Sequence, residues 1–441
     1  MSLMDSYLLD WANLLLRWLH VVVAIAWIGA SFYFVWLDNH LVPPTSDDLR
    51  ARGVGGELWA VHGGGFYNPQ KYLVAPAHLP KHLHWFYWES YWTWMSGFAL
   101  FALLYLLNAD TYLIDKRVHD WSAPAAVTGA LCFLAGGWLL YDQICRRFGR
   151  QADGSIGHDG RVLGLVAVVI AVAAWGACQL FAGRAAFLIV GAMMATMMTA
   201  NVFFWIIPGQ KQVIEDMRAG RPVDPIFGQR GKQRSVHNTY FTLPVLIAML
   251  SNHYGMLYSH AWNWLVLIAL MLVGALVRTW FVKRHKGVNA WPLLVGVGVL
   301  LMGLIVGLAP SSLPVSASSS TSASASASAL GANTGSSAGS SIGSSAGPSA
   351  GASAVASAGT AAPDGPPSFE QVQSIIHNRC QSCHNAALAP KRIQLHTPEL
   401  IEQHAQDIYQ QAVVQKAMPL NNATGITEEE RAVLGRWFKS R

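Results

Sequence analysis

The chain is poor in charged residues. Asp, Glu, Lys and Arg make up only 12% of its 441 residues, whereas soluble domains average about 25%. Hydrophobic residues reach 52%, and the mean hydropathy is +0.30. This balance excludes both an ordinary soluble enzyme and an intrinsically disordered chain, so composition predicts a membrane protein.

Cysteine is also scarce. Five cysteines are too few and too scattered for a disulfide scaffold. The net charge of +6 comes from basic residues spread over short connections rather than gathered on one face, so we expect no nucleic-acid partner.

Long apolar runs are abundant. A helix of about 20 apolar residues spans the ~30 Å hydrocarbon core of a bilayer. Eight runs approach that length, near residues 13–37, 88–107, 122–141, 162–182, 185–207, 240–259, 262–282 and 291–309. The predicted fold class is therefore all-α, a polytopic eight-helix transmembrane bundle in contact with lipid.

The basic residues indicate the orientation of this bundle. The connections after the odd-numbered runs hold 17 Lys and Arg residues, against 3 at the amino end and in the other connections. Cytoplasmic loops carry the excess of Lys and Arg. Both ends of the chain are thus predicted outside, which in a bacterial inner (cell) membrane means the periplasm.

Composition divides the chain into three parts. Residues 311–367 are almost entirely Ser, Ala and Gly with occasional Pro and Thr, a composition typical of a flexible tether. Residues 368–441 regain large apolar residues at helical spacing. We therefore expect a membrane domain at 1–310, a tether at 311–367 and a small domain at 368–441.

The small domain contains a C-x-x-C-H motif. Cys380 and Cys383 can form thioethers to the two vinyl groups of a haem, and His384 can then ligate the iron. Met418, which precedes Pro419, is the predicted sixth ligand, so the metal ligands are His384 and Met418. The alternatives for the sixth ligand are His396 and His404. A redox dithiol or half of a zinc site remains the alternative to one covalent haem c in a class I cytochrome c-like domain.

Two histidines lie inside the predicted membrane helices. Ionisable groups at such positions are expensive and mark functional sites. From the rise of an α-helix, His20 lies ~13 Å and His253 ~9 Å from the outer ends of their helices. They are thus at similar depths, and we consider them either ligands of a second, b-type haem or members of a buried polar network.

The predicted cytoplasmic side is the richer in candidate catalytic groups, although the sequence leaves open which face of the membrane binds the substrate. Histidine is suited to act as a base near neutral pH, and amide groups can hold the carbonyl oxygens of a planar anion. The candidate catalytic residues are His62, His82, His84, His237, Asn201 and Asn238.

Several segments resemble the membrane-bound, cytochrome c-linked urate hydroxylases of bacteria. They are IAWIGASFYF at 25–34, TANVF at 199–203, IPGQK at 207–211, SVHNTYFTLPV at 235–245 and SNHY at 251–254. The resemblance covers residues 1–310 and the terminal domain, whereas the tether has no family pattern.

The resemblance implies an oxidoreductase that converts urate to 5-hydroxyisourate with water as the oxygen source and without forming hydrogen peroxide. Electrons would pass to the protein's own c-type haem and then to a respiratory acceptor such as a terminal oxidase. Two alternatives remain open: a quinol-to-cytochrome c oxidoreductase, and an anion transporter with an accessory cytochrome.

Overall fold

The computed structural model describes residues 3–309 and 367–441, except 74–75, 77–78, 117, 152, 154, 387–392 and 415. The predicted tether lies outside these residues. In the first part the helices are α1 (Leu3–His40), α2 (Asp47–Ala51), α3 (Trp88–Phe101), α4 (Ala109–Tyr112), α5 (Ala123–Phe148), α6 (Asp159–Leu180), α7 (Gly183–Asn201), α8 (Ile207–Arg218), α9 (Pro225–Ser251), α10 (Gly255–Tyr258), α11 (Asn263–His285) and α12 (Trp291–Gly307). Two π-helical turns, η1 (Ala102–Leu106) and η2 (Val202–Ile206), continue α3 and α7.

Five helical segments are long and apolar enough to cross a membrane. They are Trp11–His40, Ala123–Phe148, Asp159–Leu180, Gly183–Arg218 and Asn263–His285. The other three predicted runs lie in α3 with η1, in α9 and in the shorter apolar helix α12. All eight runs are therefore largely helical, and five of them meet the requirements for a crossing.

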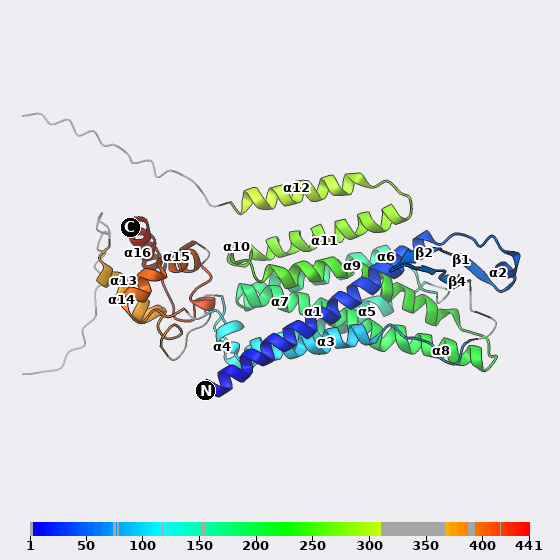
Figure 1. Ribbon diagram of the computed structural model, residues 1–441, viewed down its shortest axis with the longest axis horizontal. Helices are drawn as coiled ribbons and strands as arrows, with labels where there is room; N and C mark the ends of the chain where they lie inside the picture. Colours follow the sequence, from blue (N-terminus) through cyan, green and yellow to red (C-terminus); the bar gives the residue numbers. More distant parts are fainter. Residues whose placement is uncertain are drawn as a thin grey trace, which may run out of the picture. The chain divides into compact units, whose positions relative to one another are not determined.

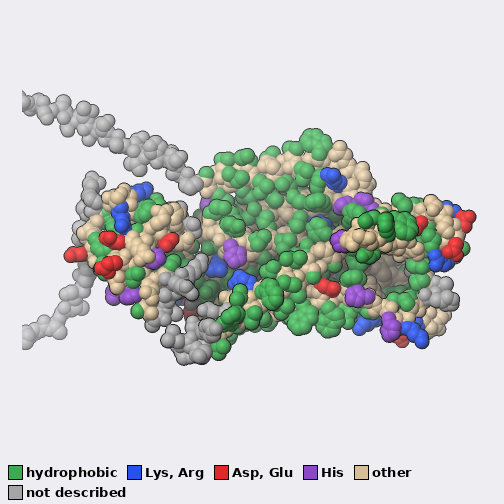
Figure 2. Space-filling model, viewed as in Figure 1, with side chains coloured by type: hydrophobic (Ala, Val, Ile, Leu, Met, Phe, Trp, Pro, Cys, Tyr) green, Lys and Arg blue, Asp and Glu red, His purple; other side chains and the backbone are tan. Residues whose placement is uncertain are grey.

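Figure 1 shows the long helices of this part lying side by side as a bundle, with α12 beside α11. Apolar side chains cover most of the bundle face seen in Figure 2. Ile25, Val168 and Val299 are 65%, 60% and 68% exposed. Such a continuous apolar surface is suited to lipid rather than water.

Small residues allow the bundle to pack tightly around α7. Ala185, Ala186 and Ala130 are fully buried, and so is the large ring of Phe187. A Cβ at Gly137 of α5 would clash with Cγ of Met193 on α7. Close helix approach through small side chains is the usual basis of association inside membranes.

The prediction for the sixth run was wrong in its boundaries. Residues 240–259 were expected to form the helix, but α9 begins at Pro225 and ends at Ser251. Asp224 caps its start by accepting the N–H of Ile226 at 2.9 Å. The first half of α9 is polar because it buries hydrogen-bonding side chains against neighbouring helices, which a hydropathy pattern cannot detect.

The first connection corrects the all-α prediction. It contains two antiparallel hairpins, β1 (Val54–Glu57) with β4 (Gln70–Tyr72), and β2 (Ala60–His62) with β3 (Gly65–Tyr67). Gly63 and Gly64 form the β2–β3 turn with φ of 58° and 81°, the positive values that a tight hairpin turn requires.

The second part, residues 367–441, is a small helical unit with its own core. Its helices are α13 (Phe369–Arg379), α14 (Pro398–Gln403), α15 (Ala405–Ile408) and α16 (Glu428–Lys439), with the short turns η4 (Tyr409–Val414) and η5 (Leu420–Asn422). Val372, Ile376 and Leu434 are fully buried in this core. α13 leads into the C-x-x-C-H motif, and the Oγ of Ser368 caps its start by accepting the N–H of Gln371 at 3.3 Å.

Candidate functional site

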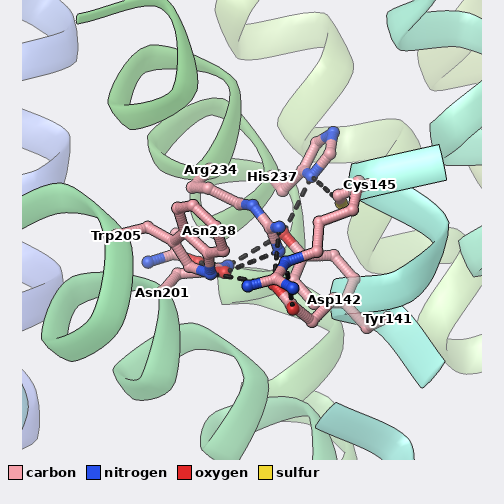
Figure 3. Close-up of polar contacts among 9 residues, drawn as sticks. Tyr141, Asp142, Cys145, Asn201, Trp205, Arg234, His237 and Asn238 are labelled. Atoms are coloured by element: carbon pink, nitrogen blue, oxygen red, sulfur yellow. Dashed lines mark hydrogen bonds and ion pairs between the residues drawn. The ribbon is translucent and has the colours of Figure 1, made fainter. Parts of the chain in front are cut away.

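A cluster of buried polar side chains lies where α5, α7 and α9 meet. Asp142 is on α5, Asn201 ends α7, and Arg234 and Asn238 lie one helical turn apart on α9. Asp142, Asn201 and Arg234 are 6%, 0% and 3% exposed. Figure 3 shows these side chains pointing toward one another from the three helices. We call this set, with Tyr141, Arg146, Trp205 and His237, the polar cluster.

Asp142 is the negative centre of the polar cluster. Its Oδ1 accepts hydrogen bonds from Nη2 of Arg234 at 2.7 Å and from Nε1 of Trp205 at 2.8 Å. Its Oδ2 lies 3.0 Å from Nε of Arg146. A buried carboxylate needs such charged and hydrogen-bonding partners, because removal from water is expensive.

Asn201 joins the charged and neutral halves of the cluster. Its Oδ1 accepts Nη1 of Arg234 at 3.2 Å, while its Nδ2 donates to Oη of Tyr141 at 2.8 Å and to Oδ1 of Asn238 at 2.9 Å. Asn238 in turn donates its Nδ2 to the carbonyl of Met198 at 3.0 Å. Each of these amide contacts fixes the orientation of the next.

His237 is the member of the cluster with an unused atom. Its Nδ1 lies 2.9 Å from Oη of Tyr141, and its buried Nε2 has no partner among the described residues. Because Oη of Tyr141 already accepts from Nδ2 of Asn201, its own proton points to Nδ1, and Nε2 carries the proton of the neutral imidazole and can donate it. A buried polar atom without a partner indicates a bound water or ligand.

The cluster carries an excess of positive charge around an indole ring. The guanidinium carbons of Arg146, Arg230 and Arg234 lie 5.0, 5.8 and 5.2 Å from the centroid of Trp205. Asp142 pairs with two of these three cations. Trp205 lies in η2, and π-helical turns of this kind are frequent at functional sites. The arrangement is suited to a planar organic anion.

The structure brings together three of the six candidate catalytic residues. Asn201, His237 and Asn238 belong to the polar cluster. His62 lies at the end of β2, and His82 and His84 lie before α3; all three are exposed and take no part in the hydrogen bonds of the cluster.

Sequence reasoning missed Tyr141, Asp142 and Trp205 as site residues. The predicted third helix ended at residue 141, whereas α5 continues to Phe148. The rule that flagged His20 applies equally to a carboxylate in a membrane helix. A predicted helix longer by one turn would have included Asp142, and its carboxylate would then have been recognised as a candidate site residue.

His20 and His253 line one cavity. Its volume is about 330 Å³, and it lies among α1, α3, α7 and α9. Arg17, Arg184 and Asn252 also border it. Both histidines thus border the same space, but the prediction that His253 lies inside a membrane helix was wrong, because α9 ends at Ser251 and His253 is an exposed residue of the turn that follows.

The C-x-x-C-H segment lies at the end of α13. Cys380 is the residue that follows the helix, and the N–H of His384 bonds to its carbonyl at 2.9 Å. Burial raises the pKa of the Cys380 thiol to about 12. Its Sγ is therefore an uncharged thiol at neutral pH, the form expected of a free cysteine before thioether formation.

His384 has the geometry of a metal ligand. Its Nδ1 lies 2.9 Å from the carbonyl oxygen of Ile393. A carbonyl only accepts, so Nδ1 carries the proton and Nε2 keeps a free lone pair, the arrangement common to ligating histidines. The residues present thus fit a proximal iron ligand. Among the described residues, no group of three or more His, Cys, Asp or Glu side chains is placed to hold a metal.

Residues 6–309 match the model of the family described as urate oxidase N-terminal. The chain belongs to this family. No curated protein matches the chain in a sequence search. No solved structure matches it either. The polar cluster and the His20–His253 cavity both lie within the family region, whereas the C-x-x-C-H segment lies outside it.

Proposed function

We propose that this protein is a membrane-bound urate hydroxylase. It converts urate and water to 5-hydroxyisourate, two protons and two electrons, and the electrons leave through the carboxyl-terminal domain to a respiratory acceptor such as a terminal oxidase. The observation that carries the proposal is membership of the urate oxidase N-terminal family over residues 6–309. The long apolar helices support a location in a membrane.

The polar cluster is the proposed site of urate oxidation. Urate is a planar monoanion near neutral pH, and the cations around Trp205 favour such a charge. The guanidinium carbons of Arg146 and Arg230 lie 5.0 and 5.8 Å from the centroid of the indole. Preorganised donors of this type stabilise charge that develops on a ring during reaction. Family membership indicates urate as the substrate, and the positive charge of the polar cluster is the reason for placing urate there.

His237 is the proposed proton-transfer residue. The hydroxyl of Tyr141 donates to Nδ1, so Nε2 carries a proton that it can donate to an oxygen or a ring nitrogen of bound urate. Asn201 holds that tyrosine oxygen through its Nδ2 at 2.8 Å, so the amide positions the tyrosine–histidine pair. We therefore assign His237 to proton transfer and Asn201 and Asn238 to positioning.

The carboxyl-terminal domain is the proposed electron exit, in a periplasmic location. His384, with Cys380 and Cys383, would hold one covalent c-type haem, and Met418 would be the sixth ligand. When bound, this haem supplies one-electron acceptance. The carbonyl of Met418 accepts Nη1 of Arg431 at 2.9 Å, which anchors the backbone that presents the Met418 side chain.

Anaerobic reduction tests the proposal. The oxidised full-length protein in lipid nanodiscs is mixed with urate without oxygen, and the c-type α-band is followed. We expect urate to reduce the haem, and His237→Gln to slow the reduction at least tenfold. The exposed His62→Gln is the matched comparison, and we expect its rate to stay within twofold of the wild type.

Two results would contradict the proposal. Reduction by quinol but not by urate would favour the quinol-to-cytochrome c alternative. Urate flux into sealed vesicles without any haem reduction would favour the transporter with an accessory cytochrome.

A further inference from the structure

The cavity among α1, α3, α7 and α9 is not used by the urate chemistry assigned to the polar cluster. At about 330 Å³ it is within the size range of small-molecule and cofactor sites. We propose that it binds one b-type haem without a covalent link, with His20 and His253 as the two axial ligands.

The hydrogen bonds of His20 leave its Nε2 ready to ligate. Nδ1 lies 3.1 Å from the carbonyl oxygen of Thr93 and 3.1 Å from Oγ of Ser96. Because the carbonyl can only accept, Nδ1 carries the proton and Nε2 has the lone pair. A second hydrogen bond of this kind orients most metal-ligating histidines. His384 of the C-x-x-C-H motif has the same arrangement with Ile393.

Gly97 makes room for the His20 ring against α3. A Cβ at this position would lie 2.8 Å from Cε1 and 3.2 Å from Nδ1 of His20. Any larger residue would therefore displace the imidazole. The glycine sets the position of the histidine as directly as the hydrogen bond to Thr93 does.

One wall of the cavity is flat and apolar. Trp94 and Phe98 of α3 stack with centroids 5.2 Å apart and an angle of 11° between their planes. Nε1 of Trp94 donates to Oγ1 of Thr196 at 3.1 Å, so the indole contributes no unused polar atom. Further apolar lining comes from Trp27, Phe101, Leu104 and Leu188. A large aromatic macrocycle suits these walls better than the small, polar urate ring.

The polar groups of the cavity match the carboxylates of a haem. Arg17 and Arg184 both border it, and guanidinium groups are well suited to pair with carboxylates. Nε of Arg184 and Oδ1 of Asn252 are buried and have no partner among the described residues. Buried polar atoms of this kind need a ligand or water to complete them, so the cavity is incomplete without an occupant.

The binding site stands independently of the substrate, but its role as a relay rests on the proposed function. In that role, the haem held by these residues would take the two electrons of one urate one at a time and pass each to the c-type haem, which the respiratory acceptor would reoxidise between the two transfers.

Haem extraction tests the proposal on purified full-length protein. Acid–acetone removes non-covalent haem and leaves thioether-bound haem on the chain, and pyridine haemochrome spectra quantify each type. We expect one extractable b-type haem for each covalent haem. Absence of extractable haem from protein with a complete c-type haem would overturn the proposal, as would a quinone recovered in its place.

Substitutions test the ligands. We expect His20→Ala and His253→Ala each to lose the extractable haem and keep the covalent one, while His119→Ala, at an exposed histidine, keeps both. Full retention in both ligand variants would overturn the proposal. His253→Met retains a sulfur ligand and should keep the haem with a changed spectrum and a raised midpoint potential. An unchanged spectrum and potential would exclude His253.

The readouts separate this proposal from the urate proposal. Haem content is measured without substrate, so extractable haem in a protein that urate cannot reduce would refute the urate function alone. Reduction by urate in a protein that lacks extractable haem would refute the b-type haem alone.

Discussion

The charge pair between Asp142 and Arg234 gives the sharpest test of the polar cluster. The substitution Asp142→Asn keeps the shape of the side chain and removes its charge. Arg234 then remains in a nearly solvent-free position, with its side chain 4% exposed, and loses its only carboxylate partner among the described residues. Trp205 keeps an acceptor if the new amide turns its oxygen toward the indole.

The expected cost follows from this burial. Breaking a buried ion pair by removing one partner costs about 3–5 kcal/mol, because the remaining charge is buried and uncompensated. The pair between Asp47 and Arg50 is 2.6 Å long but has side-chain exposures of 96% and 57%. Exposed pairs are worth about 0–1 kcal/mol, so Asp47→Asn is the matched control.

Thermal unfolding in nanodiscs measures the difference. At roughly 2 °C for each kcal/mol, we expect Asp142→Asn to lower the melting temperature by at least ~6 °C and Asp47→Asn to change it by less than about 2 °C. The double variant Asp142→Asn/Arg234→Gln removes both charges, and it should recover a large part of the loss.

Equal melting temperatures for Asp142→Asn and Asp47→Asn would refute the reasoning, because they would show that Arg234 is not held as a buried cation. A double variant less stable than the sum of its parts would refute it in a second way, since two coupled charges must destabilise less when removed together.

Three further predictions concern other parts of the chain. Gly274→Ala places a Cβ 2.9 Å from backbone atoms of α9 and should destabilise the folded protein by about 1–3 kcal/mol. Gly296→Ala, whose Cβ would have nothing within 4 Å, should leave the melting temperature unchanged in the same assay. Equal effects of the two substitutions would exclude the close approach of α11 to α9 at Gly274. Thr427→Ala removes the capping box of α16 and should cost about 1 kcal/mol, measured by denaturant loss of the c-type spectrum; an unchanged midpoint would contradict the cap. In the haem-free chain, a pKa of about 12 keeps Cys380 protonated at pH 8, with ~10⁻⁴ of it as thiolate. The alkylation rate of Cys380 should therefore rise about tenfold per pH unit and stay far below that of the exposed Cys383. Equal alkylation rates of the two cysteines at pH 8 would contradict the burial of Cys380.

The sequence predicted the helices best where the whole length of a helix is apolar. The runs at 162–182 and 262–282 match α6 and α11 within three residues at each end. The run at 240–259 failed because α9 is polar in its first half. A hydropathy pattern reports the environment of lipid-facing side chains, and it cannot distinguish a loop from a helix whose polar face is buried against other helices.

The candidate site shows the same division. Asn201, His237 and Asn238 were chosen for their chemistry, and the structure places all three in the polar cluster. Their partners Tyr141 and Asp142 lie at the end of another helix, more than 50 residues away in sequence. Only tertiary packing brings these residues together, so spacing alone could not pair them.

The hairpins were missed for a local reason. A run of glycines such as Gly63–Gly65 is compatible with a turn and also with backbone that approaches a flat ligand. In the structure Gly63 and Gly64 supply the two positive φ values of a hairpin turn. Both interpretations use the same conformational freedom of glycine, and only the pairing of β2 with β3 decides between them.

The polar half of α9 has a consequence for how the protein enters the membrane. An arginine at the centre of an inserting helix costs ~2.5–3.5 kcal/mol, and α9 carries Arg234 and other polar groups in its first half. Asp142 is synthesised about 90 residues earlier, on α5, a helix apolar enough to insert unaided. We therefore expect α9 to insert cooperatively, after α5, with the carboxylate already in place. Asp142 would then govern how much protein reaches the bilayer as well as how stable it is there.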